Sequence, residues 1–154
     1  INYIGYDDHV HDLRLETAWY SYDLTQATGA PNAHHIDPHG YVRSDGTNAI
    51  VYTSGNYPNE HIYELYLDHY GWHYYELTSI SNAVLGYASK GYIRADGVTA
   101  VVYYDNNGHI DEIRLETSWQ WADLTFLAGA PFGISPWPYN RSAVGHIYLP
   151  LILH

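Results

Sequence analysis

The sequence of 154 residues contains no cysteine and no methionine, and it has only six basic side chains against seventeen acidic ones. Without cysteine, neither a disulfide framework nor a thiolate metal site is available. The shortage of lysine and arginine argues against a nucleic acid or an anionic membrane as partner, because both need clustered positive charge. No apolar run is long enough to span a bilayer, so we expect no membrane insertion.

Tyrosine, by contrast, is abundant, with 18 residues beside five tryptophans and two phenylalanines. Rings with a polar edge suit wet, partly buried surfaces. Such surfaces include carbohydrate platforms and protein interfaces. The composition therefore favours a glycan or another protein as partner.

The stretch from residue 91 to residue 125 predicts a meander of four antiparallel strands. The dipeptides Asp96-Gly97 and Asn107-Gly108 mark tight turns within it. The four predicted strands are residues 91–94, 99–104, 109–116 and 119–124.

Recognisable versions of this stretch occur earlier in the chain. Residues 40–78 repeat all four segments. Residues 1–25 match from the second strand onward and lack the first strand, whose sequence motif is GYxR. Trp19, Trp72 and Trp119 are equivalent and follow one another at intervals of about fifty residues. A four-stranded unit repeated at this period is typical of a β-propeller blade.

The predicted fold class is therefore all-β, a β-propeller built of four-stranded antiparallel blades, with about three blades per chain. Because propellers have about four to eight blades, three cannot close a ring, and we expect a homodimer that completes a six-bladed one. Residues 26–38 and 79–90 are predicted to be connecting loops. The single repeat domain, 1–154, is divided into a blade lacking its first strand (1–39), two complete blades (40–90 and 91–131) and a tail that supplies a closure strand (132–154).

The third strand of each unit carries a carboxylate at an equivalent position, namely Asp12, Glu64 or Glu112. In a propeller both faces of a blade meet neighbours, so a repeated carboxylate must be paired or must line a groove between blades. The first alternative is an ion pair within the strand, such as Glu112 with Arg114. The second is that the carboxylate accepts hydrogen bonds from sugar hydroxyls while an aromatic ring stacks on the sugar.

Three short motifs resemble the fungal fruit-body fucose-specific lectins and, more loosely, the bacterial propeller lectins with repeats of about fifty residues. They are a second strand ending in Val-Tyr, a third strand of the form I-x-E, and Gly-Trp or Ser-Trp opening the fourth strand. The resemblance covers about residues 1–131. It implies a secreted protein that holds fucose-like monosaccharides in pockets between blades, using an arginine of strand two, a glutamate of strand three and aromatic rings.

The glutamate and tryptophan positions of that family are matched here, but its arginine is not. Where IRVY is expected, the chain has AIVY at residues 49–52 and AVVY at residues 100–103. The repeated arginines are Arg14 with Arg114 and Arg43 with Arg94, and they sit elsewhere. The candidate carbohydrate-binding residues are Asp12, Arg14, Trp19, Glu64, Trp72, Glu112, Arg114 and Trp119.

Several features have simpler structural interpretations. Each tryptophan is able to pack a strand end against the next blade, and Gly40 and Gly91 suit a close approach of inner strands. His9, His61 and His109 recur at the head of the third strand, where repetition favours a structural role.

A metal site and an enzyme are two further interpretations. Residues 34–39 hold three histidines and an aspartate that are able to bind Zn²⁺ or Ni²⁺, but a proline-containing loop rarely fixes such a geometry. We therefore predict no metal and no cofactor. We expect no enzyme, because the carboxylates repeat with the blades whereas glycoside hydrolysis needs one pair at a defined separation. The competing class is a structural propeller that assembles into a closed oligomer or a filament.

Overall fold

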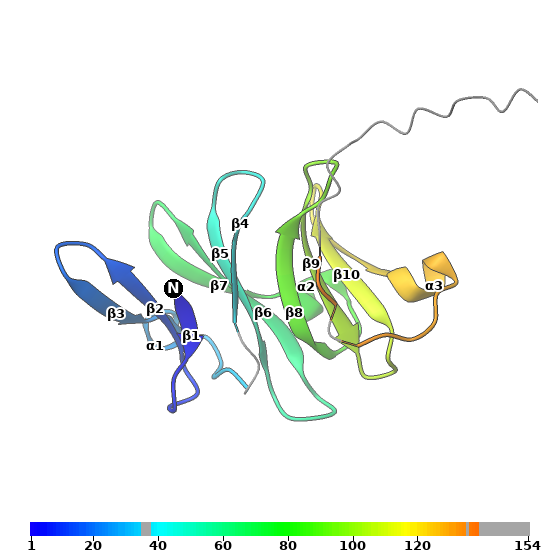
Figure 1. The fold of residues 1–154 in the computed structure, drawn as a ribbon, viewed down its shortest axis with the longest axis horizontal. Helices are drawn as coiled ribbons and strands as arrows, with labels where there is room; N and C mark the ends of the chain where they lie inside the picture. Colours follow the sequence, from blue (N-terminus) through cyan, green and yellow to red (C-terminus); the bar gives the residue numbers. More distant parts are fainter. Residues whose placement is uncertain (35–37, 135, 139–154) are drawn as a thin grey trace, which may run out of the picture.

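Three antiparallel β-sheets stand side by side in an arc in the computed structural model, which describes residues 1–34, 38–134 and 136–138 (Figure 1). The first sheet contains β1 (Asn2–Ile4), β2 (Val10–Leu15) and β3 (Trp19–Asp23). The second contains β4 (His39–Val42), β5 (Asn48–Ser54), β6 (His61–Asp68) and β7 (Gly71–Glu76). The third contains β8 (Gly86–Ile93), β9 (Thr99–Asp105), β10 (Ile110–Leu115) and β11 (Trp119–Asp123).

Each sheet is a meander in which strands that follow one another in sequence are hydrogen-bonded neighbours. This is the architecture of propeller blades, so the predicted fold class is confirmed. The first sheet has three strands, and the strand that is missing corresponds to β4 and β8 of the other two.

A short helix follows the last strand of each sheet: α1 (Leu24–Thr28), α2 (Leu77–Ser81) and α3 (Leu124–Ala128). Residues 26–38 and 79–90 were predicted to be loops and Leu124 to belong to a strand, so the three helices correct these predictions. Helices of five residues are too short to show a hydrophobic period of 3.6 residues. The first strand of the third sheet was also predicted too short, because β8 begins at Gly86 instead of Gly91.

A histidine–carboxylate pair ties the head of the third strand to the start of each helix. In the first and third sheets, Asp23 and Asp123 are also the N-caps of α1 and α3. The hydrogen bond with Asp123 raises the pKa of His109. The pairs are His9–Asp23, His61–Glu76 and His109–Asp123, at 2.6, 2.7 and 2.5 Å. The predicted structural role of these histidines is therefore confirmed.

The sheets pack face to face, which explains why β5 is apolar on both sides. Alternate side chains of a strand point to opposite faces, so Ile50 and Tyr52 enter one core and Val51 enters the other. The core shared with the first sheet contains Val10, Leu24, Ala30, Ala33, Ile50, Tyr52 and Leu65. The core shared with the third sheet contains Val51, Ile62, Leu77, Val101, Tyr103, Ile113 and Trp119.

Glycines allow the inner strands to approach one another closely, as predicted. A Cβ on Gly91 of β8 would lie 2.2 Å from the ring of Tyr41 in β4, and a Cβ on Gly40 would lie 2.2 Å from the side-chain nitrogen of Asn2. A larger side chain at Gly91 would collide with the Tyr41 ring, and one at Gly40 would displace the end of the Asn2 side chain.

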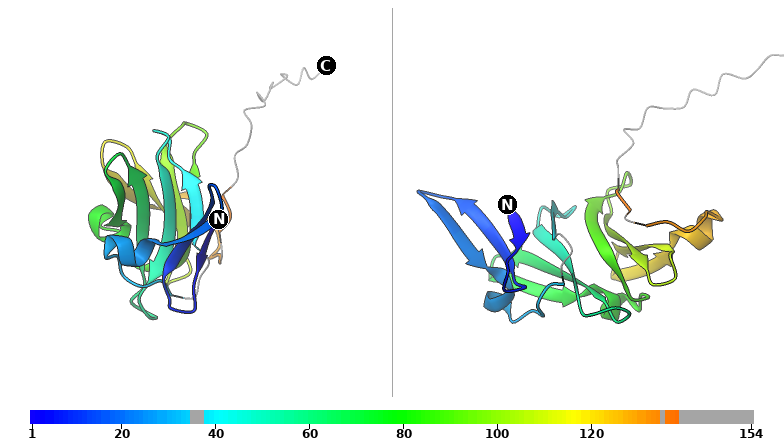
Figure 2. Two further views of the ribbon diagram at one scale, coloured as in Figure 1. Left: turned by 90° about the vertical axis from the view of Figure 1, so that its left-hand side faces the viewer. Right: turned by 60° about the horizontal axis from the view of Figure 1, so that its bottom comes forward.

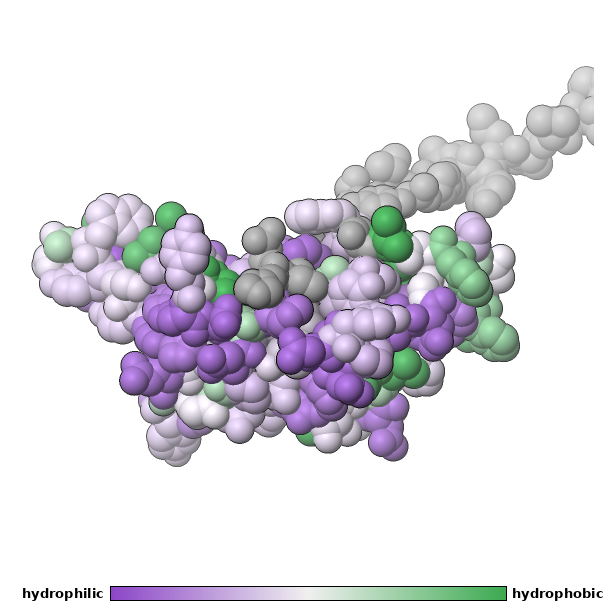
Figure 3. Space-filling view, turned by 90° about the horizontal axis from the view of Figure 1, so that it is seen from below, coloured by the Kyte–Doolittle hydropathy of each residue, from purple (hydrophilic) through white to green (hydrophobic). Residues whose placement is uncertain are grey.

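The two ends of the arc expose surfaces whose equivalents are buried between sheets (Figure 2). α1 packs against β7 and α2 packs against β11, so each of these helices covers the last strand of the following sheet. α3 has no following sheet among the described residues, and its Leu124 is partly exposed, whereas the equivalent Leu24 and Leu77 are 1% and 0% exposed. Hydrophobic residues gather at this end of the molecule in Figure 3. At the other end Trp19 is 60% exposed, whereas the equivalent Trp119 is 8% exposed.

Of the tail, the structure describes residues 132–134 and 136–138. The backbone N–H of Gly133 donates to the carbonyl oxygen of Gly108 at 3.0 Å, and the Lys90 ammonium lies 5.1 Å from the centre of the Trp137 ring. The closure strand predicted within residues 132–154 falls mainly outside the described residues. Within the described part of the chain, no helix has the length and apolar character required to cross a bilayer.

One buried carboxyl group makes the stability of the fold depend on pH. Asp111 of β10 is fully buried, and neither of its oxygens has a hydrogen-bond partner among the described residues. Burial, reinforced by the charges of Asp105 and Asp123, raises the pKa of Asp111 to about 6. Because the folded-state pKa lies above that of an unfolded chain, the folded state is favoured below about pH 4 and loses this contribution as pH rises through 6.

Asp111→Asn is therefore expected to raise the free energy of unfolding at pH 7.5 by about 1–3 kcal/mol, because it removes the buried charge. Near pH 4, where Asp111 is neutral, the variant and the original protein should be about equally stable. Urea denaturation at both pH values measures the difference. A stability gain of the same size at both would contradict the assigned pKa.

Candidate functional site

An open cleft of about 520 Å³ lies between the first and second sheets. Three of the residues predicted to bind a sugar line it together: Asp12 and Arg14 of β2 and Trp72 of β7. Its remaining lining residues are Asn2, Gly40, Tyr41, Val42, Asn48, Ala49, Ile50 and Leu67. The cleft thus combines a carboxylate, a guanidinium group and an indole ring on facing sheets.

The charged groups of this cleft are held by one another and by aromatic rings. Arg14 Nε donates to Asp12 Oδ2 at 2.5 Å, and the N-terminal ammonium lies 3.6 Å from Asp12 Oδ1. The guanidinium carbon of Arg14 lies 5.6 Å from the centre of the Trp72 ring and 5.0 Å from that of Tyr22. These are cation–π distances, and they fix the orientation of the guanidinium group. The ion pair within the strand, one of the two predicted alternatives, is therefore present here.

The equivalent carboxylate of the second sheet is closed to solvent. Glu64 is fully buried, and its oxygens accept hydrogen bonds from the Tyr41 hydroxyl and from Arg43, whose Nε lies 3.1 Å from Oε1. The guanidinium group of Arg43 also lies over the rings of Tyr66 and Trp119, at 4.7 and 5.6 Å. Glu64 and Trp119, predicted to bind a sugar, thus form part of the packing between the second and third sheets.

The third carboxylate lines a second open cleft, of about 570 Å³, on the outer face of the third sheet. Glu112 accepts hydrogen bonds from Arg94 Nη1 at 2.8 Å and from the Tyr92 hydroxyl. Arg114, its predicted partner within the strand, is more distant at 3.7 Å and bonds Glu116 at 2.7 Å. This cleft holds Glu112 and Arg114 but none of the three predicted tryptophans.

The arginines of the GYxR strands were not predicted to reach these carboxylates. In both complete sheets the tyrosine and the arginine of GYxR converge on the glutamate of the third strand: Tyr41 and Arg43 on Glu64, and Tyr92 and Arg94 on Glu112. The first sheet lacks the GYxR strand, and there Asp12 is paired with Arg14 instead. A usable signal was present in the sequence, because the unit that lacks GYxR is also the unit in which aspartate replaces glutamate.

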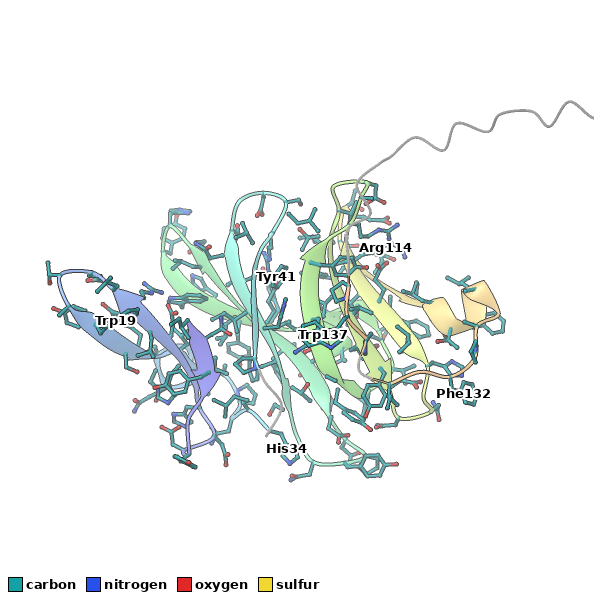
Figure 4. The ribbon with its side chains drawn as sticks, in the orientation of Figure 1. Trp19, His34, Tyr41, Arg114, Phe132 and Trp137 are labelled. Atoms are coloured by element: carbon teal, nitrogen blue, oxygen red, sulfur yellow. The ribbon has the colours of Figure 1, made fainter. Side chains whose placement is uncertain are left out.

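The tryptophans follow one geometric rule. Trp72 packs over Arg14 of the preceding sheet and Trp119 packs over Arg43 of the preceding sheet, both at 5.6 Å. Trp19 belongs to the first sheet and has no preceding sheet among the described residues. Figure 4 shows Trp19 and Arg114 on opposite sides of Tyr41, toward the two ends of the arc.

The densest histidine cluster of the sequence, residues 34–39, lies partly outside the described residues, so its geometry as a metal site is not described. Its residues 35–37 lie outside the described residues. Burial lowers the pKa of His39, which accepts a hydrogen bond from the backbone N–H of Gly91 at 3.2 Å.

No protein-family profile matches the sequence, and a search of curated protein sequences finds no match. Among solved structures, the chain is similar to a fucose lectin from Kordia zhangzhouensis in complex with methyl-fucoside. The TM-score is 0.51 and the sequence identity is 18%, over 80% of this chain and 86% of that chain. At this identity the likeness concerns the fold alone.

Proposed function

We propose that the protein is a carbohydrate-binding β-propeller whose first site is the cleft between the first and second sheets. The observation that carries this proposal is that Asp12, Arg14 and Trp72 line one open cleft. Carboxylate oxygens accept, and guanidinium groups donate, hydrogen bonds to sugar hydroxyls. An indole ring offers a flat face to the apolar C–H face of a sugar. A volume of about 520 Å³ falls in the range of small-ligand sites.

The shared fold gives the first sugar to try. The structurally similar lectin holds methyl-fucoside, so fucose-like monosaccharides are the first candidates for this chain. The polar groups differ from the pattern expected of fucose-specific lectins, because the guanidinium group of this cleft belongs to Arg14 of β2, which corresponds to the third strand of a complete blade instead of the second. A panel of monosaccharides that includes methyl-fucoside is therefore the appropriate probe.

Asp12→Asn is expected to weaken binding of the preferred monosaccharide at least tenfold. The change removes one charged acceptor and frees Arg14 from the position that Asp12 fixes. Isothermal titration calorimetry measures the effect. Asp45→Asn is the matched control, because it makes the same change in an exposed turn outside the cleft and should leave the affinity unaltered. Equal affinities of Asp12→Asn and the original protein would remove this cleft as the site.

We further propose that a second copy of the chain closes the ring and supplies the aromatic residue that the cleft on the third sheet lacks. The rule followed by Trp72 and Trp119 would place Trp19 of a second copy over the arginines beside Glu112. The exposure of Tyr3 supports this contact between two copies, since Tyr3 is 36% exposed whereas its equivalents Tyr52 and Tyr103 are 1% and 0% exposed.

The hydroxyl groups of Tyr52 and Tyr103 each make a hydrogen bond of a kind that Tyr3 does not make among the described residues. Tyr52 donates to the carbonyl oxygen of Pro31, and Tyr103 donates to that of Val84, in each case in the connection that precedes its own sheet. No connection that precedes the sheet of Tyr3 lies among the described residues. Two chains of three blades give six, a number within the range of closed propellers. Secretion, which a glycan-binding role suits, remains a prediction.

A further inference from the structure

A histidine and two aspartates meet at the outer end of the first sheet, away from the cleft proposed to bind sugar. Asp7 lies in the β1–β2 turn, His11 in β2 and Asp23 at the end of β3. One ligand atom from each of the three lies within 4.8 Å of the other two. His11 Nε2 is 3.1 Å from both carboxylate oxygens of Asp7.

The blade architecture does not account for this cluster. The other two sheets keep the pair that corresponds to His9–Asp23, namely His61–Glu76 and His109–Asp123. At the position of His11, however, they carry Tyr63 and Asp111, as the strand registers show. The described residues contain one such group of potential ligands, and it belongs to the incomplete blade alone.

The local backbone and a neighbouring ring place the ligand atoms of Asp7 and His11. Gly5 leaves the space for them, because a Cβ at that position would lie 2.3 Å from Asp7 Oδ1 and 2.9 Å from His11 Nε2. The turn closes through a hydrogen bond from Gly5 N–H to the carbonyl oxygen of His9 at 2.9 Å. The Tyr3 ring stacks on the His11 imidazole with centroids 5.2 Å apart.

His9 orients the third ligand. Its Nδ1 lies 2.6 Å from Asp23 Oδ2, while Asp23 Oδ1 accepts from the backbone N–H of Gln26 at 2.8 Å. Partial burial opposes ionisation, but these hydrogen bonds hold the pKa of Asp23 below its ordinary value. The hydrogen bond with His11 likewise lowers the pKa of Asp7. Both carboxyl groups are therefore ionised at neutral pH, as metal ligation requires.

We propose that Asp7, His11 and Asp23 form a binding site for a divalent transition-metal ion of the Zn²⁺ type, with His9 as the residue that positions Asp23. One imidazole and two carboxylates are ligands that Zn²⁺ accepts, with water completing the coordination. Ligand atoms around a tetrahedral zinc ion lie about 3.4 Å apart, so modest side-chain rotations bring the three into place. An oriented second-sphere partner such as His9 is a common feature of such sites.

Titration calorimetry of the tag-free chain with ZnCl₂ at pH 7.5 tests the proposal. We expect one Zn²⁺ per chain at this site, and an affinity at least tenfold lower for His11→Tyr and for Asp7→Asn. Tyrosine is chosen because the second blade carries Tyr63 at the equivalent position, so the blade should still fold, and circular dichroism checks this. His9→Gln should weaken binding about 10–100-fold without removing a ligand.

His73→Gln is the matched control. It removes a histidine that bonds Asp68 at 3.1 Å in a pair to which the described residues add no third ligand, and it should leave Zn²⁺ binding unchanged. The proposal is overturned if the original protein binds no Zn²⁺ at millimolar concentration. It is equally overturned if His11→Tyr and Asp7→Asn bind as the original protein does, since the ion then lies elsewhere. None of these outcomes depends on whether the protein binds sugar.

Discussion

Replacing Arg43 with methionine is expected to lower the free energy of unfolding by about 3–5 kcal/mol. Arg43 and Tyr41 are the partners of Glu64, whose carboxylate is fully buried. Methionine keeps much of the apolar volume but leaves a charged group without its counter-ion. Removing one member of a buried ion pair has a larger effect than removing both. Chemical denaturation monitored by tryptophan fluorescence measures the loss.

Two further variants separate the buried charge from simple loss of packing. Arg14→Met makes the same change in the Asp12–Arg14 ion pair, where the side chain of Arg14 is one-third exposed. Its effect on the free energy of unfolding should stay below about 1 kcal/mol. The double variant Arg43→Met with Glu64→Leu should recover most of the stability, because no uncompensated charge remains. Equal losses for Arg43→Met and Arg14→Met would show that Glu64 is not held as described.

Trp19→Glu is expected to convert the assembled protein into single chains of 17.6 kDa. In the proposed ring Trp19 would pack over a guanidinium group of the partner chain, as Trp72 and Trp119 pack over guanidinium groups within one chain. Truncating or charging a central tryptophan of an interface commonly costs 2 kcal/mol or more, which is about a 30-fold loss of affinity. Sedimentation velocity across a concentration series reports the mass.

Tyr70→Glu provides the comparison for Trp19→Glu. Tyr70 is an aromatic residue that is 81% exposed and lies in the turn between β6 and β7, away from both end faces. The Tyr70→Glu protein should keep the mass of the original. If Trp19→Glu also keeps that mass, Trp19 does not lie in the interface and the ring closure is wrong.

The architecture was predictable because the same pattern of strands and turns is repeated along the sequence. The spacing of Trp19, Trp72 and Trp119 and the turn dipeptides locate the meanders along the chain, although β8 begins at Gly86, before the predicted start at Gly91. The helices were not predictable by the same means, because five residues after a strand carry too little pattern and the capping signal of Asp23 or Asp123 is a single residue.

The site was predictable only in part. Asp12, Arg14 and Trp72 were named from sequence, but their convergence on one cleft depends on how two sheets face each other. Glu64 and Glu112 occupy equivalent positions, yet Glu64 is sealed between sheets whereas Glu112, although only 3% exposed, lines an open cleft. The reason is that a third sheet follows the second, whereas no sheet follows the third among the described residues. Position within the arc, which no local pattern encodes, decides between these environments.

The measurement that tests the account most directly is native mass spectrometry of the protein, alone and with methyl-fucoside and other common monosaccharides. We expect a dimer that takes up one preferred sugar at several sites and loses sites in the Asp12→Asn variant. A dimer without sugar adducts would keep the ring and move the function toward protein interaction. A single chain that binds none of the sugars would contradict both the ring and the glycan-binding role.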